Sequence, residues 1–219
     1  MGGALVERSL DVTFQKLVEK HESIPLGEIA EFRNGVNFTK SSRGKSVKLV
    51  GVKDFKNSYF APIDGLDTIT LDGEIPDANL LQQNDILFVR SNGNVELIGR
   101  TLLVGKLNEK TTHSGFTIRA RLTGKEYSPR FVCWFLKANT TRRQMIDSGT
   151  GTNIKSLNQE MLSSIAVPCP SIEEQEEIIN RFDQLNLESN SLAQGYSRKV
   201  EMLDVLKKSI LSEAFSGNI

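Results

Sequence analysis

A single cation and several short hydrogen-bonding side chains stand together in the stretch NDILFVRSNGNVELIGR. Its apolar run, residues 86–89, leads directly into Arg90, Ser91, Asn92, Gly93 and Asn94. Arginine and asparagine carry forked donors and acceptors that match the edges of nucleic-acid bases, and arginine also matches phosphate. Asn-Gly between two apolar runs equally predicts a two-residue hairpin turn, because both residues tolerate positive φ. A plain hairpin and a recognition tip therefore both fit this segment.

Basic residues are concentrated in two blocks of the chain. The formal net charge is zero, yet residues 32–56 hold seven Lys or Arg and one acid, and residues 90–155 hold twelve Lys or Arg and four acids. The intervening residues 57–89 hold six acids and no base. Charged runs are commonly no more than solvated surface. Two basic blocks rich in Gly, Asn, Ser and Thr still fit a protein that turns one face to phosphates.

Residue types for common catalytic chemistry are scarce. His21 and His113 have no second metal ligand nearby, and Cys133 and Cys169 stand far apart in the chain. The segment GTGTN lacks the third glycine of a dinucleotide fingerprint, and GRTLLVGKL lacks the glycine spacing and the Ser or Thr of a phosphate loop. We therefore expect no catalytic site, no metal site and two reduced thiols. A hydrolase or methyltransferase with an unfamiliar motif is the least favoured alternative.

The elements that position these residues follow from hydrophobic periodicity. Strands are expected at residues 47–52, 68–71, 86–89, 100–104 and 115–122, with a further apolar strand that ends at Pro168. Helices are expected at residues 5–20, 28–32 and 130–146, and the last should bury Phe131, Trp134, Phe135, Leu136 and Ala138. This order predicts an α+β domain with a mixed or antiparallel sheet over residues 1–170.

The C-terminal residues 171–219 predict one long helix. Ser171 and Glu174 form a capping box, and the sequence from there to residue 215 holds no proline and one glycine. Apolar residues recur at coiled-coil spacing along a helix about 65 Å long at 1.5 Å per residue. The side chains expected to meet a partner helix are Phe182, Leu185, Leu192, Tyr196, Leu203, Leu206 and Ile210.

Four segments carry a resemblance to a known family. In this order and at these distances, IPLGEIAEFRNGVNF, NDILFVRSNGNVELIGR, GTNIKSLNQEMLSSIAVPCPSIEEQEEIINRFD and LKKSILSEAFSGNI resemble the DNA-specificity subunits of type I restriction-modification systems. In that family a target-recognition domain reads half of a split DNA sequence, and a long helix sets the distance to the other half. The family pattern has two recognition domains and two long helices. This sequence has one of each, so we expect either a natural half-subunit or half of a longer protein.

The resemblance implies a non-catalytic subunit that binds double-stranded DNA and docks a methyltransferase subunit and a restriction and translocase subunit. The chain should bind no cofactor, and S-adenosylmethionine belongs on the methyltransferase partner. Two copies are expected to pair as a homodimer through their long helices. Since neither a signal peptide nor a membrane-spanning stretch is evident, we expect a cytoplasmic protein. The alternative is a coiled-coil adaptor whose globular head binds protein, which would lack the steep salt dependence of a DNA reader.

With this resemblance, the candidate contacts become candidate DNA contacts. Arg90, Asn92 and Asn94 are expected to reach bases. The residues expected to bind phosphates are Lys40, Arg43, Lys45, Arg142, Arg143 and Lys155. The expected DNA-facing set is completed by Arg33, Asn34, Lys53, Ser91, Thr150, Thr152 and Asn153.

Overall fold

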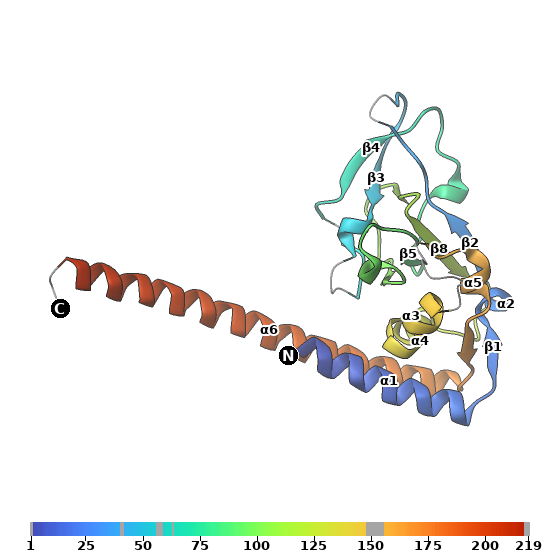
Figure 1. Cartoon of the computed structure of the whole chain (residues 1–219). Helices are drawn as coiled ribbons and strands as arrows, with labels where there is room; N and C mark the ends of the chain where they lie inside the picture. Colours follow the sequence, from blue (N-terminus) through green and yellow to red (C-terminus); the bar gives the residue numbers. More distant parts are fainter. Residues whose placement is uncertain (1, 40–41, 56–58, 63, 148–155, 217–219) are drawn as a thin grey trace.

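Helices pack below a β-rich region, and one helix extends far beyond the domain (Figure 1). The computed structural model describes residues 2–39, 42–55, 59–62, 64–147 and 156–216. The helices are α1 (Gly2–Lys20), α2 (Leu26–Ile29), α3 (Pro129–Lys137), α4 (Asn139–Asp147), α5 (Gln159–Ser163) and α6 (Ile172–Phe215), with short 3-10 helices η1 (Val52–Asp54), η2 (Asp77–Asn79) and η3 (Val95–Leu97). The strands are β1 (Ser23–Pro25), β2 (Ala30–Asn34), β3 (Ser46–Val50), β4 (Asp67–Thr70), β5 (Ile86–Val89), β6 (Thr101–Leu103), β7 (Thr111–His113), β8 (Thr117–Leu122) and β9 (Ala166–Pro168).

The central sheet has four strands in the order β2-β8-β5-β6, and each neighbouring pair is antiparallel. All four residues of β5 are apolar, so the strand is buried on both faces. Ile86 and Phe88 join the core shared with the helices, whereas Leu87 and Val89 join a second core with Val50 of β3. A smaller sheet, β4-β3-β7, is mixed, because β3 pairs antiparallel with β4 and parallel with β7. The predicted α+β fold with antiparallel and mixed sheets is confirmed.

The helical layer is held together by aromatic side chains. Phe14 of α1 lies with its ring centroid 5.6 Å from Phe131, 5.4 Å from Phe135 and 5.8 Å from Phe182. The first two contacts are edge-to-face and the third is stacked, which are the geometries that aromatic pairs favour. Three helices distant in sequence, α1, α3 and α6, are therefore fixed around one ring.

The predicted helices need two corrections. The helix expected over residues 130–146 is divided, because Ala138 adopts an extended ψ of 137° between α3 and α4. Its expected buried face is confirmed. The helix expected over residues 28–32 is wrong, since α2 ends at Ile29 and residues 30–34 form β2, whose pairing with β8 outweighs the local helical pattern.

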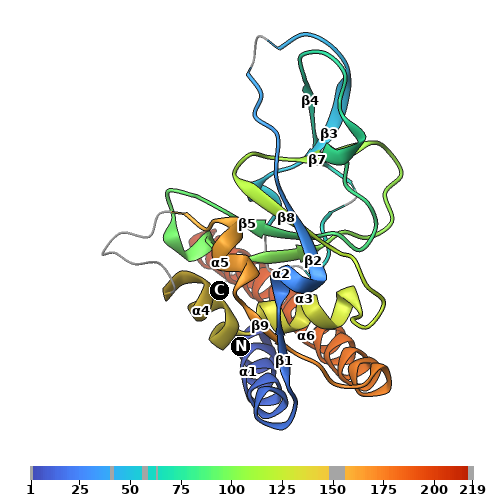
Figure 2. The same cartoon turned by 90° about the vertical axis from the view of Figure 1, so that its right-hand side faces the viewer.

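Helix α6 is a continuous helix of 44 residues, and its predicted N-cap is present, with Ser171 Oγ accepting from Glu174 N at 3.3 Å. Helix α1 runs antiparallel to the first half of α6, from an ion pair between Lys20 and Glu174 to an N-terminus beside the middle of α6 (Figure 1). Figure 2 shows the two helices side by side, seen nearly end-on. From Asn190 onward every described side chain of α6 is exposed. Among the described residues, therefore, no other element buries the side chains of the second half of this helix.

Candidate nucleic-acid interface

The main chain of Arg90 and Ser91 is fixed between two other segments. Arg90 N donates to Phe116 O at 2.8 Å, and Arg90 O accepts from Leu157 N at 2.7 Å. Ser91 forms an antiparallel bridge with Ser156. The carboxyl end of β5 is therefore held by the turn before β8 on one side and by the chain leading to α5 on the other. The Arg90 side chain is half-buried and makes no ion pair with another described residue.

Asn34 lies at the same edge of the central sheet. It ends β2, which runs parallel to β5 across β8, and its Oδ1 accepts from Gln159 Nε2 of α5 at 3.3 Å. Phe116, at the tight turn before β8, leaves 61% of its surface exposed at this edge. We call this set the polar edge and define it by Asn34, Arg90, Ser91, Asn92, Phe116, Ser156 and Gln159. The structure thus brings together candidates from both basic blocks, and adds Phe116 and Gln159, which the sequence pattern missed.

The turn after Arg90 is not the two-residue hairpin that Asn-Gly predicted. Strands β5 and β6 do pair, but η3 intervenes, and the glycine with positive φ is Gly99 (φ 75°) rather than Gly93. Asn92 Oδ1 accepts from Asn94 N at 2.8 Å, and Asn94 Oδ1 accepts from Glu96 N at 3.0 Å as the N-cap of η3. Both amide oxygens stabilise the loop, so any base contact would use their N–H groups.

Acidic residues form ion pairs with some lysines of the first basic block. Because β3 and β4 are antiparallel, Lys45 lies 2.7 Å from Glu74 and Lys53 lies 2.5 Å from Asp67. The hydrogen bond to Asp67 is the main cause that raises the pKa of Lys53. The Arg43 main chain also donates to Asp72, at 2.7 Å. Basic and acidic blocks that are separate in the sequence therefore meet in space, although exposed pairs of this kind exchange partners at little cost.

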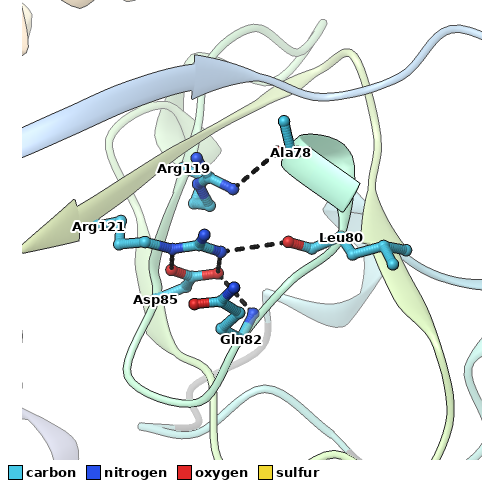
Figure 3. Close-up of polar contacts among 6 residues, drawn as sticks. All are labelled: Ala78, Leu80, Gln82, Asp85, Arg119 and Arg121. Carbon is cyan, nitrogen blue, oxygen red and sulfur yellow. Dashed lines mark hydrogen bonds and ion pairs between the residues drawn. The ribbon is translucent and has the colours of Figure 1, made fainter. Parts of the chain in front are cut away.

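Three arginines bind the chain around η2, and the sequence pattern gave no sign of this cluster; Figure 3 shows two of them, Arg119 and Arg121. Arg119 and Arg121 lie on β8, where Arg119 Nη1 donates to Ala78 O at 3.0 Å and Arg121 binds Asp85. Arg33 on the neighbouring strand donates to Asn79 Oδ1 at 3.2 Å. All three guanidinium groups hold the chain around η2 against the central sheet. Arg119 and Arg121 of β8, which are buried and half-buried, thus make contacts that stabilise the fold.

His113 lies close to these arginines and is almost fully buried. Thr117 Oγ1 lies 2.7 Å from Ser114 O, which can only accept, so we assign the hydroxyl proton to that carbonyl and Nδ1–H of His113 as the donor in the 2.9 Å contact with Thr117. His113 Nε2 then carries a lone pair and has no partner among the described residues. Burial, followed by the charges of Arg119 and Arg33, lowers the pKa of His113 to about 3. The ring stays neutral at physiological pH.

The two candidate arginines of α4 differ in their surroundings. Arg142 is half-buried, and its guanidinium donates to Ile98 O at 3.1 Å and to Glu96 O, which anchors η3. Burial, followed by the charge of Arg100, lowers the pKa of Arg142. Arg143 is exposed beside it. Lys40, Thr150, Thr152, Asn153 and Lys155 lie outside the described residues.

The expected partner face of α6 divides into two parts. Phe182 is fully buried against Phe14 and Trp134 of its own chain, and Leu185 packs partly buried on the same core. These two side chains are therefore not available to a partner helix as expected, because α1 and α3 of the same chain already cover them. The remaining members are at least half exposed: Leu192, Tyr196, Leu203, Leu206 and Ile210.

The described residues contain neither a metal-binding cluster nor a membrane-spanning helix. Within them, no group of three His, Cys, Asp or Glu side chains is placed to hold a metal ion. No helix of the described part is long and apolar enough to cross a membrane. Cys133 and Cys169 are both free thiols, and burial raises the pKa of Cys133 to about 11, so this thiol is protonated at neutral pH.

The chain is similar in sequence to known proteins over most of its length. The EcoKI specificity subunit of a type I restriction enzyme from Escherichia coli (strain K12) is 27% identical over 87% of this chain and 41% of its own length. The StySPI specificity subunit from Salmonella potsdam is 25% identical over 87% of this chain and 41% of its own length. The chain thus spans about two fifths of these relatives.

Solved structures share the fold. One, from a study of complex assembly and conformational transition of the type I R-M system, has a TM-score of 0.68 at 16% identity and covers 97% of this chain and 53% of that chain. The HsdS subunit from Thermoanaerobacter tengcongensis has a TM-score of 0.61 at 14% identity, with 99% and 53% covered. The family described as Type I restriction modification DNA specificity domain matches residues 19–202, which is most of the sequence. The resemblance carried by the four sequence segments is therefore confirmed, and the chain belongs to the type I restriction-modification DNA specificity domain family.

Proposed function

We propose that this chain is a non-catalytic recognition module that binds double-stranded DNA through the polar edge. The observation that carries the proposal is the convergence of Asn34, Arg90 and Gln159 at one edge of the central sheet, in a chain of the DNA specificity domain family. Base readout requires side chains that start from a fixed main chain. The two main-chain hydrogen bonds of Arg90 provide such a base for its guanidinium.

The polar edge has side chains of the kinds that distinguish base pairs. Arginine donates two hydrogen bonds to guanine O6 and N7, and the amides of asparagine and glutamine match adenine N6 and N7. We assign Arg90 to the first role, and Asn92 with Asn94 to contacts through their N–H groups. Arg43, Lys45 and Arg143 are assigned to phosphates, together with Lys40 and Lys155. On DNA binding, Lys45 would leave its exposed carboxylate partner and pair with a DNA phosphate instead.

Catalysis is assigned to partner subunits. A methyltransferase subunit would bind S-adenosylmethionine and modify the DNA, and a restriction and translocase subunit would cut it. This chain would recognise the target sequence. The relatives support this assignment, since they are named specificity subunits of type I restriction enzymes. The proposal includes a cytoplasmic location, where these partners and the DNA meet.

The projecting half of α6 is assigned to a second copy of the chain. The exposed apolar side chains from Leu192 to Ile210 recur at coiled-coil spacing, and each fully buried Leu or Ile stabilises a pair by roughly 1.5 to 3 kcal/mol. Two copies that pair antiparallel around a two-fold axis would hold two identical domains apart. Identical domains read identical half-sites, so the target would be an interrupted palindrome.

The proposal is tested by selecting bound DNA from a random library with the chain and a methyltransferase partner. An interrupted palindrome with affinity that falls steeply as salt rises is the expected result. Binding that is indifferent to sequence and salt would instead favour an adaptor whose head binds protein. Calorimetry on the isolated chain should detect no binding of S-adenosylmethionine, and tight binding would contradict the non-catalytic assignment.

A further inference from the structure

A cleft separates the sheet domain from the long helix. One hollow, of about 290 Å³, is lined by residues of α1, α3 and α6 and by the chain before β6. A second, of about 450 Å³, is lined by η3 and α4. Both hollows include Arg100, Asn139 and Arg142 in their walls, so they adjoin one another at these residues. We call the two adjoining hollows together the basic cleft.

Cations outnumber carboxylates in the basic cleft. Arg100, Lys137, Arg142 and Arg143 line it, against Glu7 and Glu96. The difference between four cations and two carboxylates leaves a net charge of +2 on the walls. Charges of one sign in a concave, partly desolvated site attract a counter-ion more strongly than the same charges on a flat surface.

The cations are held in place by neutral groups. Lys137 Nζ donates to Thr101 O at 2.9 Å, Arg142 Nε donates to Ile98 O at 3.1 Å and Arg100 Nη1 donates to Phe55 O at 3.3 Å. These main-chain carbonyls are neutral acceptors that help to fix the positions of the three side chains. Burial lowers the pKa of both Lys137 and Arg142, and the charge of Arg100 lowers both further. The three cations therefore repel one another within the cleft.

A buried hydroxyl lies in the same wall. Thr101 is only 3% exposed, and its Oγ1 has no hydrogen-bond partner among the described residues. A buried polar group without a partner is costly, so native proteins generally satisfy it with water or a ligand. Because this oxygen has almost no accessible surface, an anion held by the cations would reach it only after a small movement of the wall on binding.

We propose that the basic cleft binds one phosphate group, with Arg100, Lys137 and Arg142 as its cationic wall and Thr101 and Asn139 as hydrogen-bonding neighbours. A phosphate offers oxygens in several directions and so can face cations on different walls, whereas the two oxygens of a carboxylate match a single guanidinium fork. The phosphate comes either from the DNA backbone or from a free phosphate-bearing small molecule. The first source rests on the proposed DNA binding, and the second does not.

Ala193 allows a test that leaves the cations intact. It is exposed on α6 and lines the cleft, so Ala193→Glu places a carboxylate at the mouth, and Ala193→Gln is a control of equal size without charge. Thermal unfolding is followed in phosphate and in chloride at equal ionic strength. The wild type and A193Q should gain Tm in phosphate, while A193E should have a raised Tm in chloride and little further response.

DNA titrations separate the two sources. If the DNA backbone supplies the phosphate, A193E should weaken binding to all sequences alike and reduce the slope of log affinity against log salt by about one, relative to A193Q. If a free small molecule supplies it, DNA binding stays unchanged and only the Tm response is lost. The proposal is overturned if A193E and A193Q agree in both measurements. A wild type that binds no DNA but keeps its Tm response would contradict only the proposed function.

Discussion

Arg121 and Asp85 form a two-pronged ion pair on the central sheet, with Nε 2.7 Å from Oδ1 and Nη2 2.8 Å from Oδ2 (Figure 3). Asp85 is almost fully buried and also accepts from Gln82 N at 2.7 Å, while Arg121 Nη2 donates to Leu80 O. The pair therefore ties β8 to the chain that precedes β5. The guanidinium and carboxylate groups satisfy one another in a place where either alone would be costly.

Loss of the Asp85 carboxylate should destabilise the domain. Asp85→Ala leaves Arg121 without its charged partner, and removal of one member of a buried pair costs about 3 to 5 kcal/mol. Urea unfolding measures the change. Glu74→Ala, which removes one member of an exposed pair, serves as the control and should cost less than about 1 kcal/mol. Equal effects of the two substitutions would show that the buried pair has no special role.

His113 should make stability fall with acid. Its pKa is about 3 in the folded chain and about 6.5 when unfolded, so the unfolded chain binds the extra proton as the pH falls below 6.5. The contribution of neutral His113 to the free energy of unfolding is fully present above pH 6.5. It is lost as the pH falls toward 3, at up to about 1.4 kcal/mol per pH unit. Between pH 7 and 5.5 the wild type should lose about 1 kcal/mol more than His113→Gln in urea unfolding. An identical loss in both proteins would contradict this account.

Phe182 should behave as a core residue. Its ring is fully buried between α1 and α3, so Phe182→Ala should cost about 3 to 5 kcal/mol of unfolding free energy. The comparison is Leu203→Ala, at an exposed position of the same helix, measured at a concentration where the chain is monomeric. There the second substitution should have little effect. A small loss for Phe182→Ala would place the residue outside the core.

Leu203 should matter for self-association. Leu203→Glu puts a charge into the proposed helix pair and should shift light scattering from a dimer to a monomer. Val205→Glu is the matched control, because Val205 is equally exposed but lies on another side of α6 from the stripe that includes Leu203. It should leave the dimer intact. A wild type that is monomeric at micromolar concentration would rule out the pairing.

Arg90 and Arg143 should affect DNA binding in different ways. Arg90→Ala should reduce discrimination between target and mismatched DNA by about 1 to 3 kcal/mol, because a bidentate base contact is lost. Arg143→Ala should instead weaken binding to all sequences and reduce the salt slope by about one. Fluorescence anisotropy with cognate and mismatched duplexes at several salt concentrations measures both. The base-contact assignment fails if Arg90→Ala preserves sequence preference.

Hydrophobic periodicity predicts the positions of those helices and strands that bury one or two continuous apolar faces. The continuous apolar run of β5 and the amphipathic spacing of α1 give their positions to within a few residues, because one or two apolar faces decide them. Strands β1, β2 and β7 were not predicted. In β7 the sequence is Thr-Thr-His, and only its place between β3 and the core makes these polar residues buried. Such strands depend on tertiary pairing, which periodicity does not report.

The candidate site was predictable only in part. The chemistry of Arg90 and its neighbours is legible in sequence, whereas their approach to Asn34 and Gln159 depends on strand order. The charge blocks misled because antiparallel pairing of β3 with β4 sets Lys45 beside Glu74. Similarly, the seven-residue spacing of α6 is uniform, and only the packing of α1 shows that Phe182 is already covered. The spacing of residues along the sequence does not show which other element will pack against each of them in the folded chain.

The direction of α1 has a practical consequence for the handling of this protein. Its N-terminus lies beside the middle of α6, next to the start of the exposed apolar face (Figure 1). A purification tag or fluorescent fusion joined before residue 2 would therefore begin on that face and compete with a second helix there. A tag that follows residue 219 would begin beyond the end of α6 instead. The two placements should give different association behaviour for the same chain.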